Sequence, residues 1–352
     1  MPTIANPFVP GRAIDLSEEL NIVPNQWGLF QQLGLFSNEH KSQKYVGIPR
    51  VTEMEALVTD RNWDERNNTI RGGDRDFLSL AIPHFPLDDA ITPNDVDGMI
   101  DYGSLMAGGN TLETIPAVMA KKMEALRKQH ARTLEFARAQ VIRDGSVYAP
   151  NGTVVTNFYT EFGVARETVY FDLESTTYNP LNSANEAVGT LQDNLLSGDI
   201  VTNMIALCSP TFFNKLVTNA FVVESFAGYS QAQGVQILNQ RLASGLGLDA
   251  RYRVFEYGGI TFIEVRGSIG GQAYVAEDEA YLLPQGSDIF RTYYAPANRF
   301  SSVNRAAQEV YMFQHINQKD DIIELMTESN FLNAVLRPQA VITLDAGADP
   351  NA

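Results

Sequence analysis

Two pairs of adjacent carboxylates and one cysteine are the side chains of this 352-residue sequence best suited to acid–base or nucleophilic chemistry. Asp88-Asp89 and Asp320-Asp321 stand in polar, loop-like stretches, whereas a general acid needs an apolar setting that raises its pKa. Cys208 follows the apolar run at 204–207, which is typical of a buried thiol that packs as a small hydrophobic group. These residues therefore do not predict a catalytic centre.

The sequence contains no recognisable metal or nucleotide motif. The four histidines are far apart and form neither HxH nor HExxH: His40, His84, His130 and His315. A single cysteine excludes a disulfide framework and a cysteine zinc site. The glycine-rich stretches 245–247 and 267–271 match no phosphate-binding pattern, and Ser268 and Ser301 lack a GxSxG elbow. We expect no cofactor, no metal and no enzymatic activity; an acidic hydrolase with dispersed carboxylates is the alternative from a different class.

The composition describes a folded, strongly acidic protein. Lys plus Arg number 26 and Asp plus Glu number 42, so the formal net charge is −16, while 44% of the residues are hydrophobic. That apolar fraction is enough for a sizeable core, and the net negative charge repels nucleic-acid phosphates. No apolar run approaches eighteen residues, and the first ten residues lack a signal-peptide pattern. We therefore expect no membrane partner.

One long helix is the clearest predicted element. Apolar or small residues recur every three or four positions from Ile115 to Val141, which predicts a helix over 115–143 that ends at Gly145. His130 lies on this apolar stripe and is expected to be a packing residue. The helix carries seven basic residues against Glu124 and Glu135, a net charge of +5. Without a nucleic-acid motif beside it, we expect these cations to meet acidic segments of this chain or of neighbouring chains.

The other patterns predict short strands, with two shorter helices, and hence an α+β fold. Asn151-Gly152 is a strong hairpin signal within 146–156, and Gly258-Gly259 marks a tight turn between two strands. The expected strands are 169–173, 221–223, 252–257, 260–265, 272–276, 322–327 and 340–344, and the expected helices are 186–198 and 210–218.

The first hundred residues predict an arm followed by an extended ribbon. Residues 1–43 combine prolines with large apolar side chains, which could dock on the chain's own body or on a neighbouring subunit. Residues 44–97 contain strand-like pieces at 44–48, 56–59, 68–70 and 77–82, around a stretch of alternating charges. A lone hairpin is marginal in water, so this ribbon needs a partner surface unless it is a solvated surface hairpin. The predicted subunit-interface residues are Trp27, Phe30, Arg61, Trp63, Asp64, Glu65, Arg66, Arg71 and Arg75.

A series of short motifs follows the ribbon in a characteristic order. The segments are 82–89 (IPHFPLDD), 91–98 (ITPNDVDG), 157–164 (NFYTEFGV), 257–262 (YGGITF), 280–286 (AYLLPQG), 294–297 (YAPA), 328–332 (ESNFL) and 337–338 (RP). Their order over residues 45–344 resembles that of the tailed-phage major capsid proteins of the lambda head-protein family. One departure is Asn330-Phe331-Leu332, where that family commonly has Asn-Pro-Leu.

The resemblance implies the Hong Kong 97-type capsid fold and a structural function. It divides the chain into an N-terminal arm (1–43), an extended β-ribbon loop (44–97), a peripheral domain (98–185) with the spine helix 115–143, an axial domain (186–320), and return strands with a C-terminal tail (321–352). It implies hexamers and pentamers of this chain in an icosahedral head, assembled in the host cytoplasm and present in the virion. An encapsulin-type compartment shell is the alternative with the same fold.

The resemblance also implies partners. Only about 43 residues precede the ribbon, too few for a cleaved scaffolding domain, so we expect a separate scaffolding protein. A portal protein and packaged double-stranded DNA held by weak non-specific contact are expected as well, and a decoration protein is an open possibility.

Covalent cross-linking of the shell is not expected. Some proteins of this fold join subunits through a lysine on the extended loop, and residues 45–120 contain no lysine. Assembled particles should therefore run as a single monomer band on a denaturing gel. A ladder of covalent oligomers would contradict this prediction.

Overall fold

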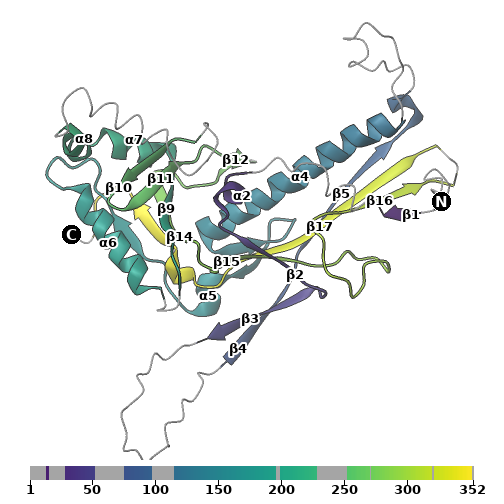
Figure 1. Ribbon diagram of the computed structural model, residues 1–352, viewed down its shortest axis with the longest axis horizontal. Coiled ribbons are helices and arrows are strands. Elements are labelled where there is room, and N and C mark those ends of the chain that lie inside the picture. Colours follow the sequence, from purple (N-terminus) through teal and green to yellow (C-terminus); the bar gives the residue numbers. More distant parts are fainter. Residues whose placement is uncertain are drawn as a thin grey trace, which may run out of the picture.

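Helix α4 (Ile115–Asp144) is the longest helix and lies along one of two six-stranded sheets (Figure 1). The computed structural model describes residues 13–15, 28–51, 75–96, 115–195, 199–227, 252–269, 271–318 and 321–350. Val118, Met123 and Leu126 are buried against Ile91 and Leu325 of the sheet. Gly145 ends the helix with φ +65°, and its N–H donates to the Val141 carbonyl over 2.9 Å. The periodicity thus predicted this helix to within one residue at its C-terminus.

The first sheet is organised around one long strand. Strand β17 (Ile323–Val335) pairs along its first half with β16 (Tyr311–Ile316) and β5 (His84–Ile91), and along its second half with β15 (Phe290–Tyr294). The edges are completed by β1 (Ala13–Asp15) on β16 and by β2 (Ser37–His40), parallel to β15. α4 covers one face of this sheet, so the sheet and the helix form an elongated two-layer unit (Figure 1).

The second sheet forms a second lobe, beside the two-layer unit of α4 and the first sheet (Figure 1). Its order is β10 (Val254–Tyr257), β11 (Ile260–Glu264), β9 (Asn203–Cys208), β14 (Glu279–Gln285), β18 (Ile342–Asp345) and β8 (Thr168–Tyr170). Helices α6 (Pro180–Asp193), α7 (Pro210–Thr218) and α8 (Ala220–Ala227) flank it in Figure 1. Residues from both lobes join in one continuous buried cluster, which connects the end of α4 to the second sheet.

Three two-stranded ribbons and two short helices complete the described elements. The ribbons are β3 (Tyr45–Val51) with β4 (Arg75–Ala81), β6 (Ser146–Tyr148) with β7 (Val154–Asn157), and β12 (Ser268–Ile269) with β13 (Gln272–Ala273). The helices are α2 (Leu29–Leu33) and α5 (Phe158–Phe162), with single 3-10 turns at Pro93–Asp95 and Pro338–Ala340. Gly152 and Gly259 adopt positive φ at the two predicted hairpin turns, which confirms both.

Two sequence predictions of local structure need correction. Residues 221–223 belong to helix α8 and not to a strand. The Asn219 side chain accepts the Phe221 N–H, and Val222 is fully buried in the core cluster that includes α7, so local capping and packing override the β preference of the Phe-Val-Val triplet. The helix expected at 186–198 is α6, which begins earlier, at Pro180 behind the capping Asn179. The predicted pieces at 56–59 and 68–70 lie outside the described residues.

The predicted domain boundaries do not coincide with the sheets. Residues 290–294 and 311–316, expected in the axial domain 186–320, are β15 and β16 of the sheet that packs on α4. Conversely, β18, expected among the strands returning to the peripheral domain, pairs in the second sheet. The chain therefore crosses between the lobes more often than a contiguous division allows.

Phe30, one of the predicted interface residues, is buried in the core of its own chain. Its side chain is 2% exposed and packs edge-on against Phe36, at 6.2 Å between ring centroids. Leu29 and Leu33 are buried in the same cluster. Of the two alternatives for the arm, the segment 29–33 adopts docking on the chain's own body. The Phe30 ring therefore keeps almost no exposed surface that a neighbouring subunit could contact.

The basic residues of α4 are largely neutralised within the chain. Lys122 lies 3.2 Å from Asp89, Arg127 lies 3.0 Å from Glu309, and Arg143 lies 2.7 Å from Asp144. These contacts confirm that cations of the helix meet acidic segments of this chain.

Candidate subunit-contact surfaces

The ribbon β3/β4 extends from the body (Figure 1), and two of its aromatic side chains are exposed. Side chains alternate between its faces: Val46, Ile48 and Leu80 are buried, whereas Tyr45 is 65% and Phe77 62% exposed. We call the surface of Tyr45 and Phe77 the outer ribbon face. Large aromatic side chains exposed on one face of a ribbon are typical of a surface that another molecule covers.

Most of the predicted interface residues belong to the ribbon tip. Arg61, Trp63, Asp64, Glu65, Arg66 and Arg71 lie outside the described residues, as does Trp27. For Arg75 only the backbone is described, and it pairs with Val51 at the end of the ribbon. The roles of these residues therefore remain predictions.

A loop between β15 and β16, residues 295–310, forms a second exposed surface. Phe300 is fully exposed and Val303 is 54% exposed. Lys44 Nζ donates to Asn298 Oδ1 over 2.6 Å, which ties the loop to the base of the ribbon. The loop is thus tied to the ribbon through Asn298, while Phe300 and Val303 are exposed to solvent.

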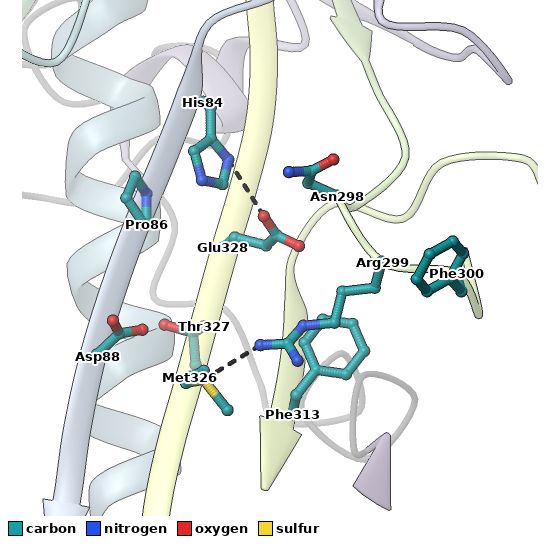
Figure 2. Close-up of a pocket in the computed structure, with 10 residues that line it drawn as sticks. All are labelled: His84, Pro86, Asp88, Asn298, Arg299, Phe300, Phe313, Met326, Thr327 and Glu328. Carbon is teal, nitrogen blue, oxygen red and sulfur yellow. Dashed lines mark hydrogen bonds and ion pairs between the residues drawn. The ribbon is translucent and has the colours of Figure 1, made fainter. Parts of the chain in front are cut away.

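An open pocket of about 400 Å3 separates this loop from strands β5 and β17 (Figure 2). We call it the sheet pocket; it is lined by His84, Pro86, Asp88, Asn298, Arg299, Phe300, Phe313, Met326, Thr327 and Glu328. The Arg299 guanidinium lies over the Phe313 ring, 4.5 Å from its centroid, and its Nη2 is 3.1 Å from Met326 Sδ. His84 Nδ1 lies 3.1 Å from Glu328 Oε2, and burial raises the pKa of the Glu328 carboxyl.

A buried carboxylate of α4 fastens the arm to the body. Glu135 Oε2 accepts the Phe30 N–H at 3.1 Å, and its Oε1 accepts the Gln31 N–H at 3.2 Å. These are two of the N–H groups that a helix N-terminus leaves unpaired, and α2 has no capping side chain of its own because its N-cap is Gly28. A β-carbon at Gly28 would lie 2.2 Å from Glu135 Cδ, so only glycine permits this approach.

Arg138 completes this contact. Its Nη1 lies 3.9 Å from Glu135 Oε1, both side chains are less than 10% exposed, and its Nη2 donates to Asn38 Oδ1 and Thr292 Oγ1. Burial raises the pKa of Glu135, while Arg138 and the two backbone donors act in the opposite direction. We call Glu135 and Arg138 the arm clamp.

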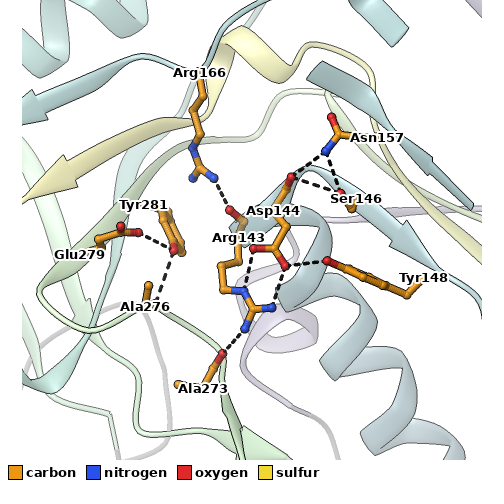
Figure 3. Close-up of polar contacts among 10 residues, drawn as sticks. All are labelled: Arg143, Asp144, Ser146, Tyr148, Asn157, Arg166, Ala273, Ala276, Glu279 and Tyr281. Carbon is orange, nitrogen blue, oxygen red and sulfur yellow. Dashed lines mark hydrogen bonds and ion pairs between the residues drawn. The ribbon is translucent and has the colours of Figure 1, made fainter. Parts of the chain in front are cut away.

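A polar network joins the end of α4 to the second lobe (Figure 3). Arg143 donates to the Asp144 carboxylate and, over 2.9 Å, to the Ala273 carbonyl. Arg166 donates to the Arg143 carbonyl and lies over the Tyr281 ring, 4.5 Å from its centroid. Arg143 therefore connects the end of α4 to the β12/β13 ribbon, and Arg166 connects it to Tyr281 of β14.

Three of the titratable residues singled out from the sequence are His130, Cys208 and Asp89, and the structure gives each a structural setting. Burial lowers the pKa of His130 to about 4 and raises that of the Cys208 thiol well above its usual value. Asp89 pairs with Lys122. Among the described residues, no group of three or more His, Cys, Asp or Glu side chains could hold a metal ion. No helix in the described part of the chain is both long and apolar enough to cross a membrane.

His130 should make the subunit sensitive to acid. Its Nε2 lies 2.8 Å from Thr327 Oγ1 and joins α4 to β17. Since the folded state holds the imidazole neutral to about pH 4, the unfolded chain takes up the proton first as the pH falls below about 6.5. Unfolding of the unassembled subunit in urea should show a loss of up to about 3 kcal/mol from this group between pH 7 and pH 4.

The variant His130→Gln should reduce this pH dependence, because an amide does not titrate. His315→Gln is the matched control: its ring is 34% exposed, so the acid sensitivity should persist. If the free energy of unfolding depends on pH equally in the parent and in His130→Gln, then His130 is not the source of the acid sensitivity.

Sequence reasoning missed the arm clamp and the exposed loop. Glu135 and Arg138 stand three residues apart in a charged helix, where an exposed pair is the usual outcome. Phe300 stands in the segment Asn298-Arg299-Phe300-Ser301-Ser302, and its apolar ring in a turn-like stretch was the only local signal.

Comparisons with known proteins agree with one another. The family described as phage major capsid protein E matches residues 13–346. The major capsid protein of Pseudomonas phage KPP10 is 38% identical, over 97% of this chain and 98% of that protein. That of Salmonella phage Felix O1 is 24% identical, over 95% and 96%. The mature capsid of bacteriophage PhiM1 contains a chain of similar fold, with a TM-score of 0.52 at 12% identity, over 90% of this chain and 86% of that one.

Proposed function

This chain belongs to the phage major capsid protein E family, and from that premise we propose that it is the structural subunit of an icosahedral phage head, built from hexamers and pentamers of itself. The Hong Kong 97-type α+β capsid fold expected from the motif order is confirmed. A structural, non-enzymatic role follows from membership of the family. The virion is accordingly where the protein resides.

The exposed outer face of the ribbon β3/β4 is the structural feature that most strongly supports the assembly proposal. It is a two-stranded element that reaches away from the body and exposes Tyr45 and Phe77 on its outer face. The inner face of the ribbon, with Val46, Ile48 and Leu80, packs in the chain's own core, and a neighbouring copy in a shell supplies the cover for the outer face. The 38% identical relative is a phage major capsid protein, which favours a phage head over an encapsulin-type compartment.

The charge distribution supports weak contact with packaged DNA. The net charge is −16, and Lys122, Arg127 and Arg143 of α4 pair with carboxylates of the same chain. DNA binding depends on cations that are free to neutralise phosphates. We further propose assembly in the host cytoplasm with a separate scaffolding protein and a portal protein; a decoration protein is an additional candidate partner.

Sedimentation velocity of the purified protein, alone and co-expressed with its scaffolding protein, tests the proposal. We expect capsomer-sized rings or closed shells. A compact monomer under every condition would contradict the assembly function.

A further inference from the structure

The hairpin β6/β7 carries the only Asn-Gly step of the sequence at its turn. Asn151, Gly152 and Thr153 are all exposed, and nothing lies within 4 Å of the position that a β-carbon on Gly152 would take. An Asn-Gly step is chemically labile in an unfolded chain, because glycine has no side chain to keep its backbone nitrogen away from the asparagine carboxamide. The turn therefore contains a modification site whose chemistry is deamidation.

Deamidation at this step needs only water. The Gly152 nitrogen attacks Asn151 Cγ, the bond from Cγ to Nδ2 breaks, and the proton of the Gly152 N–H passes through water to the departing nitrogen, which leaves as ammonia. Water then opens the resulting succinimide at either carbonyl and gives aspartate or isoaspartate. No group is oxidised or reduced, and each conversion adds one negative charge to a chain of formal net charge −16.

The folded turn holds both reacting groups in hydrogen bonds. The Gly152 N–H donates to the Ala149 carbonyl over 2.9 Å. Asn151 Oδ1 accepts the Thr153 N–H over 3.1 Å and the Thr153 hydroxyl over 2.7 Å. Attack requires the first of these bonds to open, because the nitrogen must lose its proton, and the other two restrict rotation of the carboxamide.

The flanking strands keep this turn closed. The Ala149 N–H donates to the Thr153 carbonyl over 2.8 Å, directly beside the turn. At the base of the hairpin, Asn157 Nδ2 donates to Ser146 Oγ over 2.8 Å and to the Asp144 carbonyl over 3.2 Å (Figure 3). The hairpin is thus tied to the end of α4, and its turn opens only when these bonds are broken or strained.

We propose that Asn151 is a latent deamidation site, held unreactive in the folded hairpin by Thr153 and by the hydrogen bond from Gly152 to Ala149, and converted when the turn opens. Its conversion therefore records local opening of the hairpin in each subunit. The site is separate from the ribbon contacts of the proposed function, so a negative result leaves that function intact.

Peptide mapping of unassembled subunits, incubated at mildly alkaline pH, tests the proposal. In urea, Asn151 should convert faster than the asparagines that precede larger residues. In the folded subunit its conversion should be slower than in urea by about tenfold or more, because the hydrogen bonds of the turn must open first. Equal rates in the folded and unfolded chain would overturn the proposal, as would an Asn151 that does not convert in urea.

Variants of Thr153 test which contact protects the site. Thr153→Val removes the hydroxyl donor and should raise the folded rate by about three- to tenfold while leaving the rate in urea unchanged. Thr153→Ser keeps the hydroxyl and should convert at the parent rate. Val155→Ser is the matched control, since Val155 is a 40% exposed residue of β7 outside the turn.

Two outcomes would overturn the role of Thr153. One is a parent-like folded rate in Thr153→Val, and the other is an equal acceleration in Val155→Ser, which would show general loosening of the hairpin. Circular dichroism of each variant checks that it is folded. The comparison of the folded and unfolded parent decides the proposal even if a variant fails to fold.

Discussion

Replacement of Glu135 by alanine is expected to lower the free energy of unfolding of the subunit by about 3–5 kcal/mol. The substitution leaves the Arg138 guanidinium, 4% exposed, without its carboxylate partner, and a buried unpaired charge is far less stable than a buried pair. It also removes the acceptors of the Phe30 and Gln31 N–H groups. Urea unfolding of the unassembled subunit measures the loss.

Glu124→Ala is the matched control on the same helix. Glu124 is 52% exposed and pairs with Lys128 one turn away, and exposed pairs of this kind contribute about 0–1 kcal/mol. Hydrogen exchange should localise the Glu135→Ala effect to residues 29–33, because those lose their connection to α4. If Glu135→Ala and Glu124→Ala prove equally stable, the arm clamp does not hold the arm.

Trp63→Ala is expected to leave a folded subunit that assembles poorly. Trp63 is the only tryptophan of the predicted ribbon, within a stretch of alternating charges, and buried aromatic anchors at interfaces contribute about 2 kcal/mol or more. Near-normal circular dichroism with a rise of about thirtyfold in the concentration needed for assembly is the expected result. Trp63→Phe, which retains an aromatic ring, should have a smaller effect.

Charge reversal at Arg71 and Arg75 should impair assembly in the same way. The effect should be larger at low ionic strength, because salt screens exposed charges. Light scattering of assembly at two salt concentrations measures both trends. Unfolded variants, or shells as stable as those of the parent, would show that the ribbon is not an intersubunit element.

The sequence predicted the elements whose signals are local. The helix 115–143 follows from a periodicity that depends only on neighbouring positions, and the turns at Gly152 and Gly259 follow from residues that tolerate positive φ. The order of short motifs indicated the capsid fold as a whole. The helix and the turns are properties that a single stretch of chain displays on its own, whereas the motif order is read over residues 45–344.

What the sequence did not predict depends on distant partners. β17 is thirteen residues long because β16, β5 and β15 pair along it, and only its first part shows a strand pattern. Phe30 is a large aromatic residue of the kind that often anchors an interface. It is buried in its own chain because its ring packs against Phe36 and its N–H donates to Glu135. Phe300 presents the opposite case, since no local pattern shows that its ring stays uncovered.

Cryo-electron microscopy of assembled particles tests most directly the claim that this chain is a shell subunit joined to its neighbours through the ribbon. We predict closed shells in which the outer ribbon face, Tyr45 and Phe77, is covered by an adjacent subunit. Particles in which that face stays open to solvent, or a protein that forms no particles at all, would contradict the account.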